Sequence, residues 1–290
     1  MAGAQRAGAQ MRANKYAGAC ALCGVAVAIA AGRLIGLPGS WRTICLGCSP
    51  TPPPQGDHDG WHVAPMASLD LETTGTDPLA DRILSFALLG DRSVDVCGLV
   101  DAGVDIPEAA SAVNGLTAEA LAGAPQPVEA VGLIVQWLDD LIERGVGLVV
   151  YNAAYDLTMV RAEAARWGVR QPDWQRLLVV DPFVIDWGIE RGGLGPRRLS
   201  DVAAYYGVAL TDAHDATADA RAARSIAREI GLRHPLVAAG TLDDLMERQR
   251  AWFADRADDW NQYARRVGRT LDDPMGWPLA RLGAEPLVTA

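Results

Sequence analysis

The chain of 290 residues is 50% hydrophobic and 21% charged, which suits one large or two modest folded domains and excludes a wholly disordered protein. Its formal net charge of −10 excludes a protein that coats nucleic acid through bulk positive charge. A site that holds nucleic acid through metal ions is compatible with this charge, because such a site is itself a cluster of carboxylates.

The N-terminal segment differs from the rest of the chain in charge and in cysteine content. Residues 1–62 carry a net charge of +3, which leaves −13 for the remainder. Two C-x-x-C pairs separated by 21 residues are typical of a four-thiolate zinc site. We therefore predict a zinc-binding module over residues 1–50, with one structural Zn²⁺ and two short strands about a glycine turn in residues 25–37. The predicted ligands are Cys20, Cys23, Cys45 and Cys48.

Two other interpretations of this segment stay open. The cysteines could form disulfides, and the apolar stretch 17–31 resembles the core of a signal peptide or a membrane anchor. Paired thiols at zinc-site spacing favour a reducing compartment. We accordingly expect a cytoplasmic protein without a membrane partner.

A proline-, glycine- and aspartate-rich stretch follows at residues 51–64 and lacks any hydrophobic periodicity. Such composition predicts a linker. His58 and His62 lie in it, and we expect both side chains to be solvated.

The next segment, residues 65–235, is predicted to be a mixed α/β domain, because three leading strands are followed by alternating helices and strands. Cys97 lies on the third strand and is expected to be a small core residue. Strands are predicted at 66–71, 83–89, 94–100, 146–151 and 177–180, and helices at 127–144, at 154–167 and from 215 onward.

Residues 236–290 are predicted to form a C-terminal helical extension. Thr241 and Asp244 have the spacing of a capping box, and apolar residues continue at helical spacing to about Val267. The aromatic residues of this helix are expected to pack on the core, and a base-stacking platform is the alternative. The tail around Trp277 and Pro278 receives no assignment.

Acidic residues occur at three places where they could carry chemistry. Asp70 and Glu72 end the first strand on the same side, where they repel each other unless a cation lies between them. Asp156 falls in the first helical turn after a later strand, and His214 and Asp219 begin the final helix of the domain. Each is also compatible alone with a solvated strand end or a helix cap.

In order, the segments LDLETTGTDP (69–78), YNAAYD (151–156) and HDATAD (214–219) resemble the DnaQ-like (DEDDh) 3′–5′ exonucleases. This family includes the proofreading epsilon subunit of DNA polymerase III, ribonuclease T and oligoribonuclease. The resemblance covers about residues 65–232 and implies a ribonuclease-H-like mixed sheet flanked by helices. Residues 106–117, 180–181 and 199–208 also resemble stretches of the family.

The resemblance implies a role for each matching residue. His214 would be the general base. Tyr151 stands where many members have a histidine and is not expected to be catalytic. Two Mg²⁺ or Mn²⁺ ions would be held by Asp70, Glu72, Asp156 and Asp219, and the terminal nucleotide would be contacted by Thr73, Thr74, Asn114 and Gly115.

The expected function is a metal-dependent 3′–5′ exonuclease. It would act on single-stranded or frayed DNA and release nucleoside 5′-monophosphates, with a polymerase or a replication or repair protein as an expected partner. A 3′–5′ exoribonuclease is the first alternative, since no residue in the sequence indicates whether the site accepts or excludes the 2′-hydroxyl of RNA. A non-catalytic nucleic-acid-binding adaptor is the second, but such an adaptor would be expected to lack one of the carboxylates or the histidine.

Overall fold

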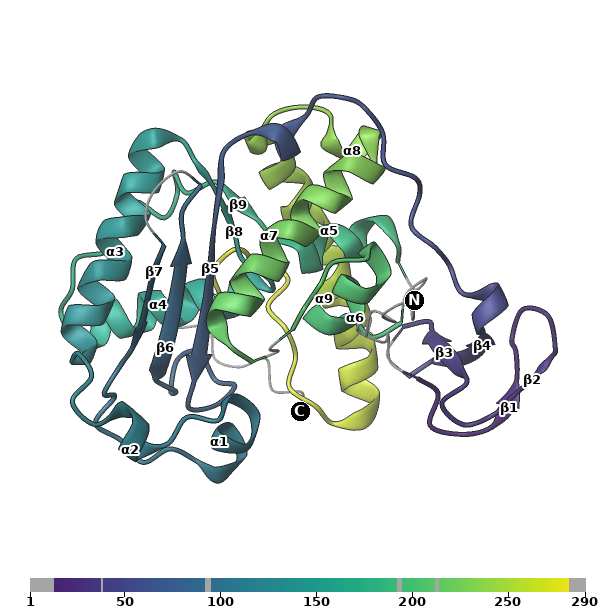
Figure 1. The fold of residues 1–290 in the computed structure, drawn as a ribbon, viewed down its shortest axis with the longest axis horizontal. Helices are drawn as coiled ribbons and strands as arrows, with labels where there is room; N and C mark the ends of the chain where they lie inside the picture. Colours follow the sequence, from purple (N-terminus) through teal and green to yellow (C-terminus); the bar gives the residue numbers. More distant parts are fainter. Residues whose placement is uncertain (1–12, 38, 92–94, 192–194, 212–213, 282–290) are drawn as a thin grey trace, which may run out of the picture.

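The computed structural model describes residues 13–37, 39–91, 95–191, 195–211 and 214–281. Their largest sheet is mixed and has the strand order β7-β6-β5-β8-β9 (Figure 1). Antiparallel pairing joins β5 to β6 and β6 to β7, while β8 runs parallel to both β5 and β9. The mixed α/β class is thereby confirmed. The strands are β5 (Met66–Thr73), β6 (Ile83–Leu89), β7 (Val96–Leu99), β8 (Gly147–Val149) and β9 (Val179–Val180).

Helices cover both faces of this sheet. The long helices α3 and α4 pack on one face, and α7 crosses β5 and β6 on the other. Small side chains let α7 approach closely, since Ala216 and Ala220 meet Ala87 of β6. The helices are α1 (Glu108–Asn114), α2 (Ala118–Leu121), α3 (Pro127–Arg144), α4 (Ala153–Arg166), α5 (Pro182–Ile189), α6 (Leu199–Tyr206), α7 (Ala216–Arg233), α8 (Pro235–Ala238) and α9 (Leu242–Val267).

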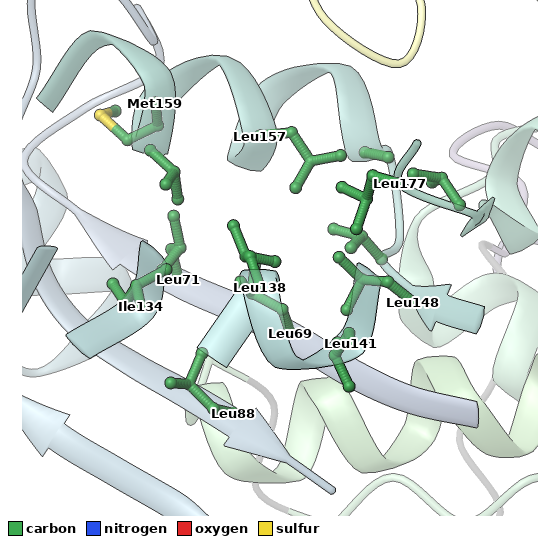
Figure 2. Packing of buried hydrophobic residues seen from close by; sticks show 14 of the residues in the cluster. Leu69, Leu71, Leu88, Ile134, Leu138, Leu141, Leu148, Leu157, Met159 and Leu177 are labelled. Atoms are coloured by element: carbon green, nitrogen blue, oxygen red, sulfur yellow. The ribbon is translucent and has the colours of Figure 1, made fainter. Parts of the chain in front are cut away.

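The interior between the sheet, α3 and α4 is closely packed with aliphatic side chains (Figure 2). Leu69 and Leu71 point from β5 into this layer, so Asp70 and Glu72 must point to the opposite face. This alternation fixes both carboxylates on the α7 side of the sheet. The layer includes the side chains labelled in Figure 2, which are Leu69, Leu71, Leu88, Ile134, Leu138, Leu141, Leu148, Leu157, Met159 and Leu177.

One residue of β7 contradicts the expectation drawn from its strand. Cys97 is exposed and is not part of the core. The reason is that β7 is an edge strand, and its backbone pairs only with β6 among the described residues. Thr217 of α7 donates a hydrogen bond to the Cys97 Sγ atom at 3.3 Å.

The N-terminal module consists of two small hairpins, which lie beside α6 and α9 on the side of the molecule away from the larger sheet (Figure 1). The expected strands in residues 25–37 are present, but they do not pair with each other. Each pairs instead with a strand next to one cysteine pair, an arrangement that brings the two C-x-x-C turns together. The pairs are β1 (Gly18–Ala19) with β2 (Ala26–Val27), and β3 (Gly32–Ile35) with β4 (Arg42–Cys45), which is followed by the 3-10 turn η1 (Leu46–Cys48).

The stretch predicted as a linker lies along α7 and α8 and ends in the 3-10 turn η2 (Trp61–Val63). The Trp61 indole N–H donates to the carbonyl oxygen of Val237 at 2.8 Å. The expectation of a solvated His62 is wrong, because only 4% of this side chain is exposed. Gly231 of α7 makes room for it, since a Cβ at Gly231 would lie 2.2 Å from the His62 Cβ.

The predicted C-terminal helix is confirmed as α9, and the Thr241 hydroxyl caps it by accepting from the Asp244 amide at 3.2 Å. Met246 and Phe253 of α9 are buried against the core. The tail then returns to the sheet, where Trp277 is 5% exposed. Across the described residues, no helix is both long enough and apolar enough to cross a membrane.

Candidate active site

The three sequence motifs meet at the end of β5. Oxygen atoms of Asp70, Glu72 and Asp219 all lie within 4.8 Å of one another. Asp70 and Glu72 share a face of β5, whose register with β6 shifts between Glu72 and Thr73. Asp219 reaches them from the first turn of α7, which packs across that face.

Asp156 enters the same cleft from α4, although it lies outside the group of three carboxylates. Its position depends on the sharp turn between β8 and α4, where Asn152 adopts a left-handed φ of 62°. The buried Asp181 carboxylate holds this turn by accepting from the amides of Asn152 and Ala153, both at 2.9 Å. Asp181 thus aligns the start of α4 and with it Asp156.

His214 lines the same cleft and is exposed to solvent. Its backbone N–H donates to Asp219 Oδ2 at 3.2 Å, which couples the histidine to the start of α7. A φ of 70° places His214 in the left-handed region, which a residue other than glycine adopts infrequently. His214 therefore lines the cleft while its side chain stays accessible to solvent.

Burial and mutual repulsion make it unfavourable for the carboxylates of this cluster to be ionised together. Burial, followed by the charge of Asp156, raises the pKa of Asp70 well above its usual value. Burial and the charge of Asp219 raise the pKa of Glu72 to about 8. Because nearby negative charges oppose ionisation, a bound cation would lower these pKa values and relieve the repulsion.

The donor set suits a hard divalent cation. Asp219 Oδ1 is buried and has no hydrogen-bond partner, while its Oδ2 accepts from His214. A buried carboxylate with an unpartnered oxygen beside two other carboxylates is an environment that suits an oxygen-coordinated cation such as Mg²⁺ or Mn²⁺. The residues present thus fit the metals that the sequence resemblance implies.

The cleft over these residues has a volume of about 670 Å³ and includes residues that sequence reasoning did not select. Several are basic or aromatic and come from α5, α9 and the segment before α6. No sequence motif singles out these residues, because they reach the carboxylates only through the packing of separate elements. They are Phe183, Arg197, Arg198 and Arg256, together with Trp260, which belongs to the aromatic residues that the sequence offered as an alternative base-stacking platform.

A second pocket of about 600 Å³ adjoins the cleft through Glu72 and Tyr155. Of the predicted nucleotide contacts, Thr73, Thr74 and Asn114 line it, whereas Gly115 does not and instead ends α1 with a φ of 72°. Tyr155 is a further lining residue that sequence reasoning missed. Its hydroxyl lies 2.6 Å from Thr73 Oγ1 and 2.5 Å from the carbonyl oxygen of Gly75.

Tyr151 also lines the cleft, but its hydroxyl is engaged elsewhere. It donates to the carbonyl oxygen of Arg197 at 2.8 Å. Burial raises the pKa of Tyr151 well above its ordinary value, so this hydroxyl stays protonated. This arrangement suits a structural residue.

The N-terminal cysteines form a second cluster. The Sγ atoms of Cys20, Cys23, Cys45 and Cys48 all lie within 4.8 Å of one another, and all four cysteines are free thiols. Cys23 and Cys45 are 3.7 Å apart at sulfur. Tetrahedral coordination at a Zn–S distance of about 2.3 Å implies a sulfur separation of about 3.8 Å, whereas a disulfide requires about 2.0 Å. The cluster therefore has the dimensions of a four-thiolate metal site.

Solved structures share the fold of the larger domain. Escherichia coli exonuclease I in complex with a dA16 oligonucleotide has a TM-score of 0.54 and 20% identity, over 64% of this chain and 44% of that one. Its complex with a dT13 oligonucleotide has a TM-score of 0.53 and 19% identity, over 66% of this chain and 46% of that one. These likenesses concern the fold.

Sequence comparison identifies the family. DNA polymerase III PolC-type of Thermotoga maritima is 29% identical over 150 residues, which are 47% of this chain and 10% of that protein. The present chain thus corresponds to about a tenth of this curated relative. The sequence model of the RNase T exonuclease family matches residues 68–227, a range that contains Asp70, Glu72, Asp156, His214 and Asp219. Because this match spans more than half of the chain, the protein belongs to the RNase T exonuclease family.

Proposed function

We propose that this exonuclease removes nucleotides from the 3′ end of single-stranded or frayed DNA and releases nucleoside 5′-monophosphates. The observation that carries the proposal is the convergence of Asp70, Glu72 and Asp219 within 4.8 Å, beside an exposed histidine. Asp156 adds a fourth carboxylate to the same cleft.

The carboxylates would hold two divalent cations, Mg²⁺ or Mn²⁺. When bound, such cations stabilise the negative charge that develops at phosphorus in an in-line displacement. His214 accepts a proton from the attacking water as general base, and its exposure lets that proton pass to solvent. Water attack on phosphorus breaks the bond to the 3′ oxygen of the preceding nucleotide, which leaves a nucleoside 5′-monophosphate.

The pocket beside Glu72 is the proposed position of the 3′-terminal nucleotide. Thr73, Thr74 and Asn114 line it, and apolar atoms from α1 offer a surface for the base. The Thr74 hydroxyl already donates to Asp81 Oδ1 at 2.8 Å, so Thr74 would shape the pocket more than bind the sugar. Tyr155 closes the side nearest the scissile phosphate.

DNA is favoured over RNA because both sets of relatives point to it. The PolC relative is a DNA polymerase, and the solved exonuclease I complexes contain deoxyoligonucleotides. The likeness to PolC also supports a polymerase or a replication or repair protein as the partner. For the four-thiolate site we propose one structural Zn²⁺, since thiolate ligands in tetrahedral spacing suit that ion.

The decisive experiment compares DNA and RNA oligonucleotides of one sequence, labelled at the 5′ end and incubated with Mg²⁺. We expect stepwise shortening of the DNA from its 3′ end, and preferential shortening of the RNA would assign the enzyme to the ribonuclease branch. Asp70→Asn should lower the rate on the order of 10²-fold or more, because the lost charge stabilisation is worth several kcal/mol. Asp243→Asn is the matched control and should retain wild-type activity, because Asp243 is an exposed carboxylate in the first turn of α9.

An Asp70→Asn variant that keeps more than about a tenth of the wild-type rate would contradict the assignment of Asp70 as a metal ligand. Its thermal unfolding temperature should be at least that of the wild type without added divalent cations, because the substitution removes a carboxylate that repels its neighbours.

A further inference from the structure

A groove of about 200 Å³ leads from the catalytic cleft to the N-terminal module. Phe183, Arg197, Arg256 and Trp260 line both the groove and the cleft, so the two spaces are continuous. The other side of the groove is formed by the β3–β4 connection of the N-terminal module, where Trp41 is 40% exposed.

The module is held against this side of the domain by close contacts. A Cβ atom at Gly195 would lie 2.2 Å from the Leu34 carbonyl oxygen, so only a glycine permits this approach between the segment before α6 and β3. Gly39 lies similarly close to Tyr263 of α9, since its Cβ would be 2.7 Å from that ring. Figure 1 shows β3 beside α6 and α9. The module therefore forms a wall of the groove.

The chemistry of the groove suits unpaired nucleotides. The Trp260 indole N–H donates to the Thr270 carbonyl oxygen at 3.2 Å, which fixes the ring next to Tyr263 at a centroid distance of 5.6 Å. The Arg256 guanidinium lies over the Phe183 ring at 5.1 Å. Aromatic faces stack on unpaired bases of any sequence, and Arg256, whose charge is shared with Asp272, borders the same surface.

Acidic residues in this region are already paired with arginines. Asp259, which lines the groove, accepts from Arg191 at 2.6 Å and 3.0 Å. Asp272 at the edge of the cleft accepts from Arg256 at 2.7 Å. Their charges are thus compensated within the protein, which limits their repulsion of a phosphate chain.

Beyond Trp41 a third groove of about 330 Å³ continues along the module. Trp41 and Pro196 line both of these grooves. The third groove also contains Tyr16, which is 79% exposed, and Lys15, which is the only lysine of the chain. Basic and aromatic side chains therefore continue the path onto the segment of the chain that carries net positive charge.

We propose that these grooves bind the single DNA strand on the 5′ side of the scissile nucleotide, so that the four-cysteine module is part of the substrate-binding surface. The inference rests on the proposed function, which places the 3′ end in the cleft. The bases must be unpaired, because bases stacked in a duplex cannot also stack on Trp41 and Tyr16. We call the surface formed by Lys15, Tyr16, Trp41, Arg256 and Trp260 the strand track.

The test compares oligothymidylates of about 16 and about three nucleotides, lengths that do and do not reach beyond the cleft. Trp41→Ala should raise KM for the long substrate about tenfold and leave kcat/KM for the short one unchanged, since one stacking contact is lost outside the cleft. Leu46→Ala is the matched control, because Leu46 is an exposed apolar residue of the module that lines neither groove. Equal effects of Trp41→Ala on both substrates, or no effect on either, would overturn the proposal.

Two further measurements keep the test decisive. If Trp41→Ala lowers the metal content or the unfolding temperature, Tyr16→Ala replaces it, since this mostly exposed side chain can be removed without a cavity. Lys15→Gln should make the dependence of binding on salt weaker. The slope of the logarithm of the association constant for the long strand against the logarithm of salt concentration should become shallower by about 0.7, the value of one phosphate contact. An unchanged slope would remove Lys15 from the strand track.

Fluorescence anisotropy of a labelled long strand, measured without added divalent cation, reports binding separately from cleavage. It therefore distinguishes failure of the strand track from failure of the proposed function. A wild-type chain that degrades neither oligonucleotide contradicts the proposed function. The Trp41→Ala variant must still bind the long strand more weakly than Leu46→Ala does, or the strand track is also wrong.

Discussion

His214 is the residue whose removal should separate proton transfer from metal binding. His214→Ala should lower the rate by about 10²–10⁴, the usual contribution of a positioned general base. The Mg²⁺ concentration that gives half-maximal activity should remain unchanged, because the histidine is not a proposed ligand. His58→Ala, in the stretch before β5, is the matched control.

Added imidazole provides a second readout for the same variant. It should partly restore activity to His214→Ala, since the substitution leaves space beside the attacking water. Loss of activity together with a large rise in the Mg²⁺ requirement would show that His214 supports the metal site instead.

The Glu72 carboxyl makes the stability of the metal-free protein depend on pH. Burial and the charge of Asp219 raise its pKa from 4.5 to about 8 on folding. Between these values the folded state binds protons that the unfolded state has released, so stability falls as pH rises from about 4.5 to about 8. Thermal unfolding without added divalent cations should show this decline, and Mg²⁺ should stabilise most at the alkaline end, where the carboxylates are ionised.

The Glu72→Gln variant should show a weaker decline of unfolding temperature with pH, because it lacks the titrating group. Glu143→Gln, an exposed carboxylate on α3, should keep the wild-type dependence. Identical pH dependences for Glu72→Gln and the wild type would place the coupled protons elsewhere.

The order of three short motifs, through their resemblance to an exonuclease family, was sufficient to select the candidate carboxylates and histidine, and the structure brings Asp70, Glu72 and Asp219 together in one cleft with Asp156 and His214. Tyr155 could not be predicted in the same way. Its hydroxyl contacts Thr73 and Gly75, which are about eighty residues away in the chain, and no local pattern encodes that contact.

At the level of secondary-structure elements, Asp181 connects three segments that are distant in sequence. Its carboxylate begins α5, accepts from the two amides that start α4, and accepts from the Trp277 indole N–H at 3.1 Å. Asp181→Ala should destabilise the fold by roughly 1–3 kcal/mol or more, because buried donors lose their acceptor. It should also lower activity, since the turn before Asp156 is no longer held.

Urea unfolding measures the loss of stability of Asp181→Ala, and the rate of oligonucleotide cleavage measures its loss of activity. Thr241→Ala removes an exposed helix cap from α9 and should cost only about 1 kcal/mol, with activity retained. A stable and fully active Asp181→Ala protein would show that the β8–α4 turn is maintained by its own backbone.

Helix boundaries followed the sequence closely where the apolar period was long. The predicted range 127–144 coincides with α3, and the helix predicted from the cap at Thr241 to about Val267 is α9. The expected pairing of the two strands in residues 25–37 was wrong, because strands of two to four residues carry too little pattern to identify their partners.

For the whole molecule, the cysteine cluster and the carboxylates proposed to bind Mg²⁺ should respond to different treatments. We expect about one zinc per chain after purification, because four sulfur ligands bind Zn²⁺ far more tightly than carboxylates bind Mg²⁺. The Cys45 backbone N–H lowers the pKa of Cys20 to about 6, which favours the thiolate that a metal requires.

Elemental analysis of a Cys20→Ser, Cys45→Ser protein should show loss of zinc, with cleavage of a trinucleotide retained. Cys97→Ser changes an exposed cysteine outside the cluster and should leave the zinc content unchanged. A zinc-free variant that folds but cannot cleave a trinucleotide would contradict the independence of the two sites.

The sequence by itself determined the α/β class, the ends of the long helices, the spacing of the candidate carboxylates and histidine, and the paired cysteines. All of these depend on spacing within a strand, a helix or a short motif, which local chemistry encodes. Only the tertiary structure decided that His62 is buried, that Trp277 reaches Asp181, and that Trp41 and Trp260 border one groove. These contacts join residues far apart in the chain. Gly231 permits the burial of His62, and Gly39 and Gly195 permit the close approach of the N-terminal module that brings Trp41 to the groove.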